Sequence, residues 1–219
     1  RGSGEHSRMP GAAVALRRTL AGKPVQSSIL LGLRGTGKTV LLNRIHTLSE
    51  DLKLHTTFIE GPEEGRLVQL LFPRMLAILR RVSGVEAAKA LASKALAAMK
   101  NVAAVFKVSY EGFDLAIDAD PGVADTGDLE IDLPELFEAI GKACKAADTG
   151  WVLIIDEVQY LSSKELASLI AAIHKMNQRA LPILFFAGGL PQIARLTGEA
   201  KSYSERLFLF PPIGALEPA

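Results

Sequence analysis

The sequence predicts an α/β fold: a five-stranded parallel β-sheet flanked by helices. Two short apolar runs, residues 29–31 and 151–155, have the length and composition of buried strands. The first run leads into a glycine-rich turn, and the second ends in the carboxylate pair Asp156 and Glu157. Apolar residues recur at helical spacing between these runs, and strands that alternate with helices are typical of parallel sheets.

The glycine-rich turn matches the phosphate-binding pattern Gly-x-x-x-x-Gly-Lys-Thr. A strand pattern stands directly before it and a helical pattern directly after it, which is the context that this motif requires. Glycine takes backbone angles that a Cβ forbids, so the loop can wrap a phosphate and point its N–H groups inward. The predicted nucleotide-binding residues are Gly32, Leu33, Arg34, Gly35, Thr36, Gly37, Lys38, Thr39 and Val40.

Two side chains of this loop have predicted roles of their own. Lys38 supplies a mobile positive charge for the outer phosphates, at the start of a helix whose dipole also favours anions. Thr39 offers a hydroxyl ligand to Mg²⁺. The loop alone therefore predicts that the chain binds a nucleotide.

Apolar spacing predicts the elements on either side of the loop in the first half of the chain. A short amphipathic helix is expected over residues 10–20, before the break at Gly22 and Pro24. After the loop we expect a helix to about residue 52, a β-branched strand over 54–59, and helices over 66–81 and 85–104.

The pattern in the middle of the chain changes from helical spacing to alternation. Residues 105–117 alternate apolar and polar side chains around a Glu-Gly turn, which predicts a β-hairpin. With the two helices before it, this hairpin would form an insertion, residues 66–117, in the sheet domain. The acidic stretch 118–132 has loop composition, and Asp132 is expected to cap a helix over 133–147.

The carboxylates after the strand at 151–155 complete the predicted site. Ligands of open α/β sheets bind at the carboxyl edge of the strands. Asp156 is placed to hold Mg²⁺, directly or through water, and Glu157 to polarise the water that attacks the γ-phosphate. Either carboxylate alone would also suit a helix N-cap, but its pairing with the phosphate loop favours the catalytic interpretation.

The last part of the chain returns to helix and strand patterns. A helix over 161–180, capped by Ser162 or Ser163, is followed by strands over 181–186 and 207–210. Arg206 directly precedes the last strand, and Arg195 lies in the helix before it. Each arginine either covers an apolar surface with its stem or acts on the γ-phosphate as a sensor or arginine finger.

Composition bounds the remaining possibilities. The 25 Lys and Arg nearly cancel the 24 Asp and Glu, so the total charge points to neither nucleic acid nor an acidic membrane. Cys144 is the only cysteine, which excludes an intrachain disulfide and fits a reducing cytoplasm. No apolar run reaches the ~20 residues of a membrane helix, and we expect no membrane partner.

Four stretches together resemble the AAA+ ATPases, in the branch near the origin-recognition ATPases and the STAND signalling ATPases. They are GLRGTGKT at 32–39, IDEVQYL at 155–161, FAGGLP at 186–191 and YSERLF at 203–208. The first two are specific to phosphate-loop ATPases, and the last two are weaker signals.

The resemblance implies ATP and Mg²⁺ binding, with slow hydrolysis that drives a conformational switch. It also implies a catalytic strand between the loop strand and its neighbour. Arg206 would be an arginine finger acting on a neighbouring subunit, and therefore in a homo-oligomer. The domain would span residues 10–215, with residues 1–9 a tag or disordered start and 216–219 the start of a truncated lid. DNA would be bound only through a region absent from this chain.

Two departures from the family weaken the expected hydrolysis. The strand that ends in Ala187, Gly188 and Gly189 lacks the Asn, Thr or Ser that usually serves there as a polar sensor. The resemblance also implies a helical lid with a sensor arginine, and we expect the sequence to stop where that lid begins.

Competing interpretations differ in what happens to the γ-phosphate. No Asn-Lys-x-Asp motif of GTPases and no ABC signature occurs. A P-loop small-molecule kinase would transfer phosphate to an acceptor rather than to water. A non-hydrolysing, nucleotide-dependent interaction module would bind ATP without turnover.

Overall fold

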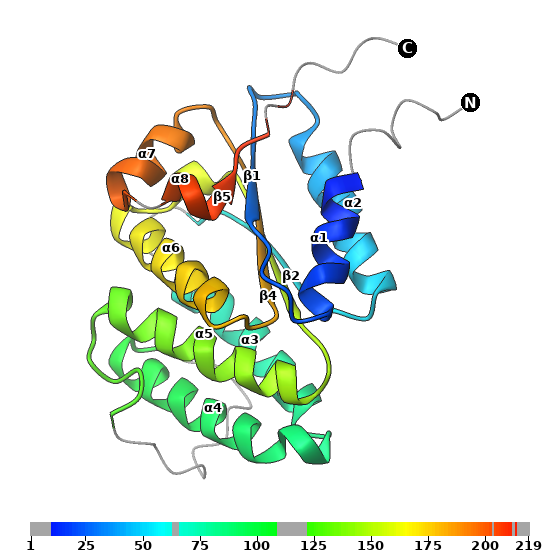
Figure 1. Ribbon diagram of the computed structural model, residues 1–219. Coiled ribbons are helices and arrows are strands. Elements are labelled where there is room, and N and C mark those ends of the chain that lie inside the picture. The colour runs from blue at the N-terminus through cyan, green and yellow to red at the C-terminus, as the bar shows by residue number, and fades with distance from the viewer. Residues whose placement is uncertain (1–9, 63–65, 109–121, 203, 212, 214–219) are drawn as a thin grey trace.

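The computed structural model describes residues 10–62, 66–108, 122–202, 204–211 and 213. Its strands form one parallel sheet with the order β2-β3-β4-β1-β5, which confirms the predicted α/β class (Figure 1). The strands are β1 (Ser27–Leu31), β2 (His55–Glu60), β3 (Trp151–Asp156), β4 (Ile183–Gly189) and β5 (Phe208–Leu209).

The expectation that the catalytic strand lies between the loop strand and its neighbour was wrong, because β3, which ends in Asp156, is not next to the loop strand β1. β4 lies between them, with Leu30 of β1 opposite Gly188 and Ile154 of β3 opposite Phe186. All of β4 is buried, because its apolar side chains pack on both faces of the sheet. A contact between the ends of β1 and β3 must therefore cross the end of β4.

Helices cover both faces of the sheet (Figure 1). Alternate strand residues point to opposite faces of the sheet. Ile154 and Phe186 pack with α1 and α2, whereas Leu153 and Phe185 pack with the larger helical layer, which contains α3, α4, α5 and α6. The helices are α1 (Pro10–Leu20), α2 (Lys38–Asp51), α3 (Leu67–Val82), α4 (Glu86–Val105), α5 (Leu129–Ala146), α6 (Ser163–Gln178), α7 (Ile193–Ala200), α8 (Ser204–Leu207) and the 3-10 turn η2 (Val158–Tyr160).

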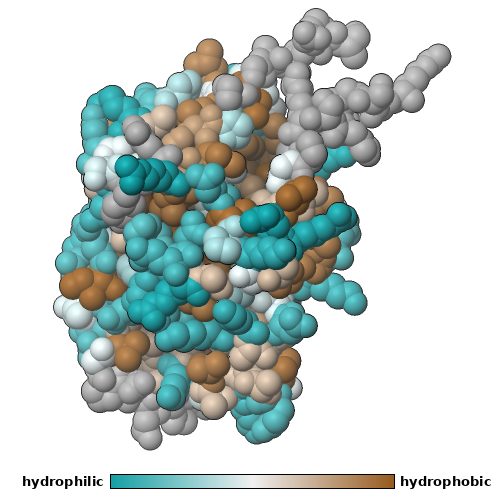
Figure 2. All heavy atoms as spheres, in the orientation of Figure 1, coloured by the Kyte–Doolittle hydropathy of each residue, from teal (hydrophilic) through white to brown (hydrophobic). Residues whose placement is uncertain are grey.

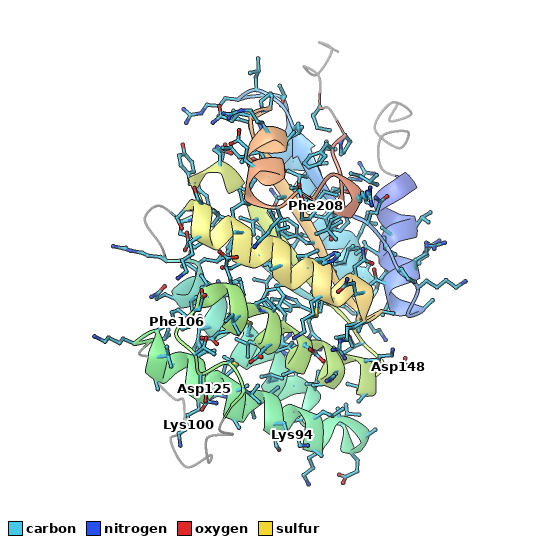
Figure 3. The ribbon with its side chains drawn as sticks, turned by 60° about the vertical axis from the view of Figure 1, so that its left-hand side comes forward. Lys94, Lys100, Phe106, Asp125, Asp148 and Phe208 are labelled. Carbon is cyan, nitrogen blue, oxygen red and sulfur yellow. The ribbon has the colours of Figure 1, made fainter. Side chains whose placement is uncertain are left out.

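The larger layer holds most of the apolar core. Trp151, at the start of β3, packs on Phe137 of α5 with ring centroids 4.8 Å apart and donates its indole N–H to Thr57 Oγ1 at 3.0 Å. Phe208 of β5 packs on Phe185 at 5.9 Å and is labelled beside the sheet in Figure 3. On the face shown in Figure 2, polar side chains cover much of α4, α5 and α6. This packing holds the strand ends that carry the site.

The predicted hairpin over 105–117 is not supported where the structure describes it. Val105 is the last residue of α4, and Phe106 and Lys107 form a turn rather than a strand. Phe106 packs against the core of the helical layer, which accounts for its apolar character (Figure 3). The rest of the expected hairpin, from residue 109, lies outside the described residues.

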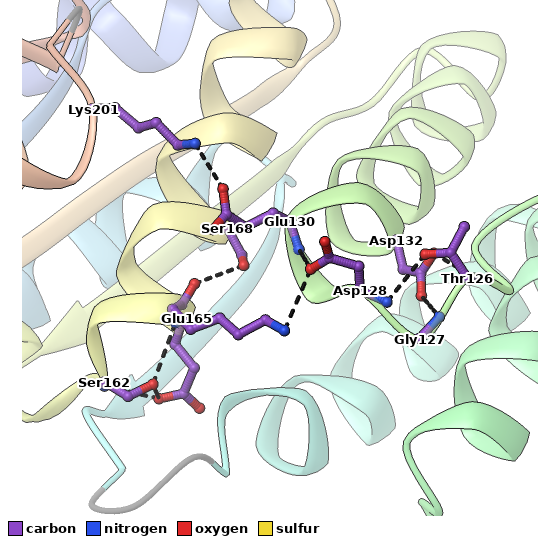
Figure 4. Close-up of polar contacts among 10 residues, drawn as sticks. Thr126, Gly127, Asp128, Glu130, Asp132, Ser162, Glu165, Ser168 and Lys201 are labelled. Carbon is purple, nitrogen blue, oxygen red and sulfur yellow. Dashed lines mark hydrogen bonds and ion pairs between the residues drawn. The ribbon is translucent and has the colours of Figure 1, made fainter.

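The prediction that Asp132 caps a helix was wrong by one helical turn. Asp128 is the N-cap of α5 and accepts a hydrogen bond from the Glu130 N–H at 3.2 Å. Asp132 is fully buried and accepts bonds from Thr126 and Gly127, which secure the preceding turn (Figure 4). Asp128 and Asp132 each precede a helical pattern, as an N-cap aspartate does, so the local sequence did not distinguish them.

The expected cap of α6 is Ser162, in a reciprocal capping box with Glu165. Glu165 also accepts the Leu67 N–H at 2.7 Å, so it ties the start of α3 to the start of α6. Among the described residues, no helix combines the length and apolar character needed to cross a membrane.

Candidate nucleotide-binding site

The glycine-rich loop joins β1 to α2 at the carboxyl edge of the sheet. Gly35 and Gly37 have φ of 78° and 86°, in the left-handed region that favours glycine. A Cβ on Gly32 would lie 2.5 Å from Thr36 Oγ1, so this position also requires glycine. Gly37 gives α2 no side-chain cap, and the first N–H groups of α2 are therefore available to an anion.

Lys38 lies folded back over the loop. Its side chain is only 5% exposed, and its Nζ donates to the carbonyl oxygens of Gly32 and Leu33 at 2.8 Å each. These two bonds hold a buried ammonium group beside the N–H groups at the start of α2. Positive charge and backbone donors thus converge on one place, as phosphate binding requires.

Thr39 and Asp156 join the two halves of the predicted site. Thr39 Oγ1 donates to Asp156 Oδ2 at 2.5 Å, and the other carboxylate oxygen accepts the Glu157 N–H at 2.9 Å. Asp156 is only 6% exposed, so these two bonds fix its orientation. A hydroxyl and a carboxylate are the oxygen ligands that Mg²⁺ prefers, so this pair fits the predicted metal site.

Gly188 makes that contact geometrically feasible. It lies near the end of β4, which separates β1 from β3, and a Cβ there would lie 2.6 Å from Asp156 Oδ1. Only a residue without a side chain lets the carboxylate reach across the end of β4 to Thr39.

Glu157 stands next to this contact in a strained backbone conformation. Its φ of 51° and ψ of 44° are left-handed, which costs a non-glycine residue about 1–2 kcal/mol. The chain turns there from β3 into η2, and the Glu157 side chain accepts a hydrogen bond from Gln159 Nε2. Gly61 packs against this turn, with a Cβ position only 2.4 Å from the Glu157 carbonyl oxygen.

A sequence profile of the AAA ATPase domain matches residues 13–186. The chain belongs to the AAA ATPase domain family. The match spans more than half of the chain and includes both the phosphate loop and the Asp156–Glu157 pair, so it confirms the resemblance to the AAA+ ATPases. No curated protein matches the chain.

Solved structures were also compared with the chain. Cdc6p from Pyrobaculum aerophilum aligns with 97% of this chain and 46% of its own, at 13% identity and a TM-score of 0.51. The Aeropyrum pernix ORC1 protein in complex with DNA aligns with 98% and 46%, at 14% identity and a TM-score of 0.46. The chain therefore spans less than half the length of these structures, and its fold is similar to that of Cdc6p.

Arg206 is not part of the same site within this AAA domain. The residue is exposed, and it precedes Phe208, which pairs with Ser27 at the beginning of β1. The phosphate loop follows the other end of β1, so Arg206 lies at the opposite edge of the sheet. Arg195 is also exposed and bonds to Glu199 one turn along α7, at 2.5 Å.

Several residues near the site were not singled out by sequence reasoning. Gly188 was noted only because it replaces a polar sensor residue, and Gly61 was assigned no role in the site. Gln159 contacts Glu157, and Tyr160 OH accepts from Arg34 Nη2 of the loop at 2.8 Å. Their proximity depends on strand order and on the turn after β3, which no local pattern specified.

We expect Gly188→Ala to weaken Mg²⁺-dependent nucleotide binding. The added methyl group would force Asp156 away from Thr39, and displaced support of a metal ligand typically costs ~10-fold or more in metal affinity. Titration of a fluorescent ATP analogue at several Mg²⁺ concentrations measures this. Gly198→Ala is the matched control, because a Cβ there meets no atom within 4 Å. Equal Mg²⁺ dependence in both variants would contradict this role of Gly188.

Proposed function

We propose that this AAA domain binds ATP with Mg²⁺ and hydrolyses it slowly, as a conformational switch within a larger protein or assembly. The observation that carries the proposal is the 2.5 Å contact between Thr39 and Asp156. It joins the phosphate loop to the carboxylate pair. Hydrogen-bond donors for phosphate, metal ligands and a candidate base therefore share one edge of the sheet.

Each part of the site has a role in this proposal. The loop N–H groups and Lys38 bind the phosphates, and Thr39 and Asp156 would hold Mg²⁺. Mg²⁺ supplies positive charge that polarises the phosphate oxygens. Lys38 would exchange its bonds to two loop carbonyls for bonds to phosphate, which are stronger because both partners are charged.

Glu157 is the proposed base that orients and deprotonates the attacking water. Its neighbour Asp156 is engaged at both oxygens, by Thr39 and by the Glu157 N–H, whereas Glu157 is partly exposed. The two carboxylates are thus suited to different tasks, one as a metal ligand and one as a base. The slow rate is proposed because Gly188 and Gly189 offer no side chain to the γ-phosphate.

A role for Arg206 requires a second copy of the chain. Its place at the opposite edge of the sheet separates it from the phosphates of its own subunit, and its exposure leaves it free to reach a neighbour. We therefore extend the proposal to a homo-oligomer in which Arg206 acts in trans.

The trans role predicts that ATPase activity per subunit rises with protein concentration and that Arg206→Ala removes the rise. Phosphate release measured over a dilution series tests this. Arg195→Ala serves as the control, since Arg195 is already paired on its own helix. Flat specific activity together with a silent Arg206→Ala would refute the trans role.

Lys38→Ala should weaken Mg-ATP binding by ~10–100-fold, because a charged hydrogen bond contributes about 1.5–3 kcal/mol. Calorimetric titration gives the affinity, and thermal unfolding checks that the fold is retained. Lys23→Ala is the matched control, as Lys23 is exposed and precedes β1. Unchanged affinity in the Lys38 variant would remove the basis of the proposed function.

A further inference from the structure

Gln159 links the proposed catalytic base to the end of the neighbouring strand. It lies on η2, two residues after Glu157, and is partly buried. Its Nε2 donates to Glu157 Oε2, and its Oε1 accepts the Leu190 N–H at 3.3 Å. One amide group thus connects the Glu157 carboxylate to the backbone just beyond β4.

The orientation of this amide follows from its two partners. The Leu190 N–H can only donate, so it requires the amide oxygen, and the amide nitrogen must then face Glu157. An ionised carboxylate only accepts, which matches that nitrogen. The amide cannot flip without losing both bonds.

The end of β4 leaves room for this bridge. A Cβ on Gly189 would lie 3.3 Å from Gln159 Oε1 and 3.0 Å from Val158 Cγ1, both closer than most contacts of a real Cβ. The side chain missing from Gly189 therefore allows η2 to approach β4. The polar group beside Glu157 comes from η2 rather than from the strand.

The other side of η2 is connected to the phosphate loop. Tyr160 OH accepts from Arg34 Nη2, so successive η2 residues contact the base and the loop. Glutamate has several rotatable bonds, and a partly exposed carboxylate needs a partner to hold one orientation. Gln159 provides that partner from η2, a turn that is itself bonded to Leu190 and to Arg34.

We propose that Gln159 is a positioning residue that orients the Glu157 carboxylate toward the water that attacks the γ-phosphate. It does so in place of the polar side chain that β4 lacks. The inference rests on the proposed ATPase function and assigns Gln159 no contact with the nucleotide. It acts on the chemical step and leaves ATP binding unchanged.

Two substitutions of Gln159 test this by steady-state phosphate release. Gln159→Met keeps the length but removes both hydrogen bonds, and Gln159→Glu keeps the acceptor for Leu190 while losing the donor to Glu157. Each should lower kcat by at least ~10-fold, since misplacement of a catalytic group by about 1 Å has effects of this order or larger. KM for Mg-ATP should stay within ~2–3-fold. Gln192→Met, at an exposed glutamine before α7, should leave both constants unchanged.

A double-mutant cycle separates positioning from a general structural effect. Glu157→Asp withdraws the carboxylate by one methylene from Gln159, so adding Gln159→Met to it should change the residual kcat by less than ~2-fold. An equal loss in both backgrounds, or unchanged kcat in both single Gln159 variants, would overturn the inference while leaving the ATPase function intact. Absence of phosphate release by the unaltered protein would instead reject the proposed function, and the inference with it.

Discussion

The hydrogen bond between Thr39 and Asp156 is the interaction on which the rest of the site depends. It joins the start of α2, which follows β1 and the loop, to the end of β3, although β4 lies between β1 and β3. The contact is feasible only because Gly188 presents no side chain at the end of β4. Gly188 thus leaves β4 without a polar sensor side chain, and this same lack of a side chain allows the two halves of the site to meet.

This constraint has consequences on either side of the contact. With Asp156 held at both carboxylate oxygens, Glu157 follows it in a left-handed conformation and turns the chain into η2. That turn brings Gln159 to Glu157, and Tyr160 to Arg34. The packed sheet holds Asp156 rigidly, whereas the orientation of the Glu157 carboxylate depends on the short polar turn η2.

The sequence could predict what short-range patterns encode. The loop from Gly32 to Thr39 and the strand before Asp156 have local signatures, and the predicted parallel sheet is confirmed. Strand order could not be predicted from the residues, since β4 enters between β1 and β3 only through long-range packing. The α5 cap was misassigned because Asp128 and Asp132 carry the same local signal. The contact of Gln159 with Glu157 depends on a left-handed residue that no pattern revealed.

The central claim is that the γ-phosphate is transferred to water with Glu157 as the base. The direct test compares Mg-ATP binding and phosphate release for the unaltered chain, Glu157→Gln, and Glu60→Gln at the exposed end of β2. We expect Glu157→Gln to bind Mg-ATP normally and to release phosphate at least ~100-fold more slowly, with Glu60→Gln unchanged. Equal phosphate release by Glu157→Gln and the unaltered chain would contradict the account.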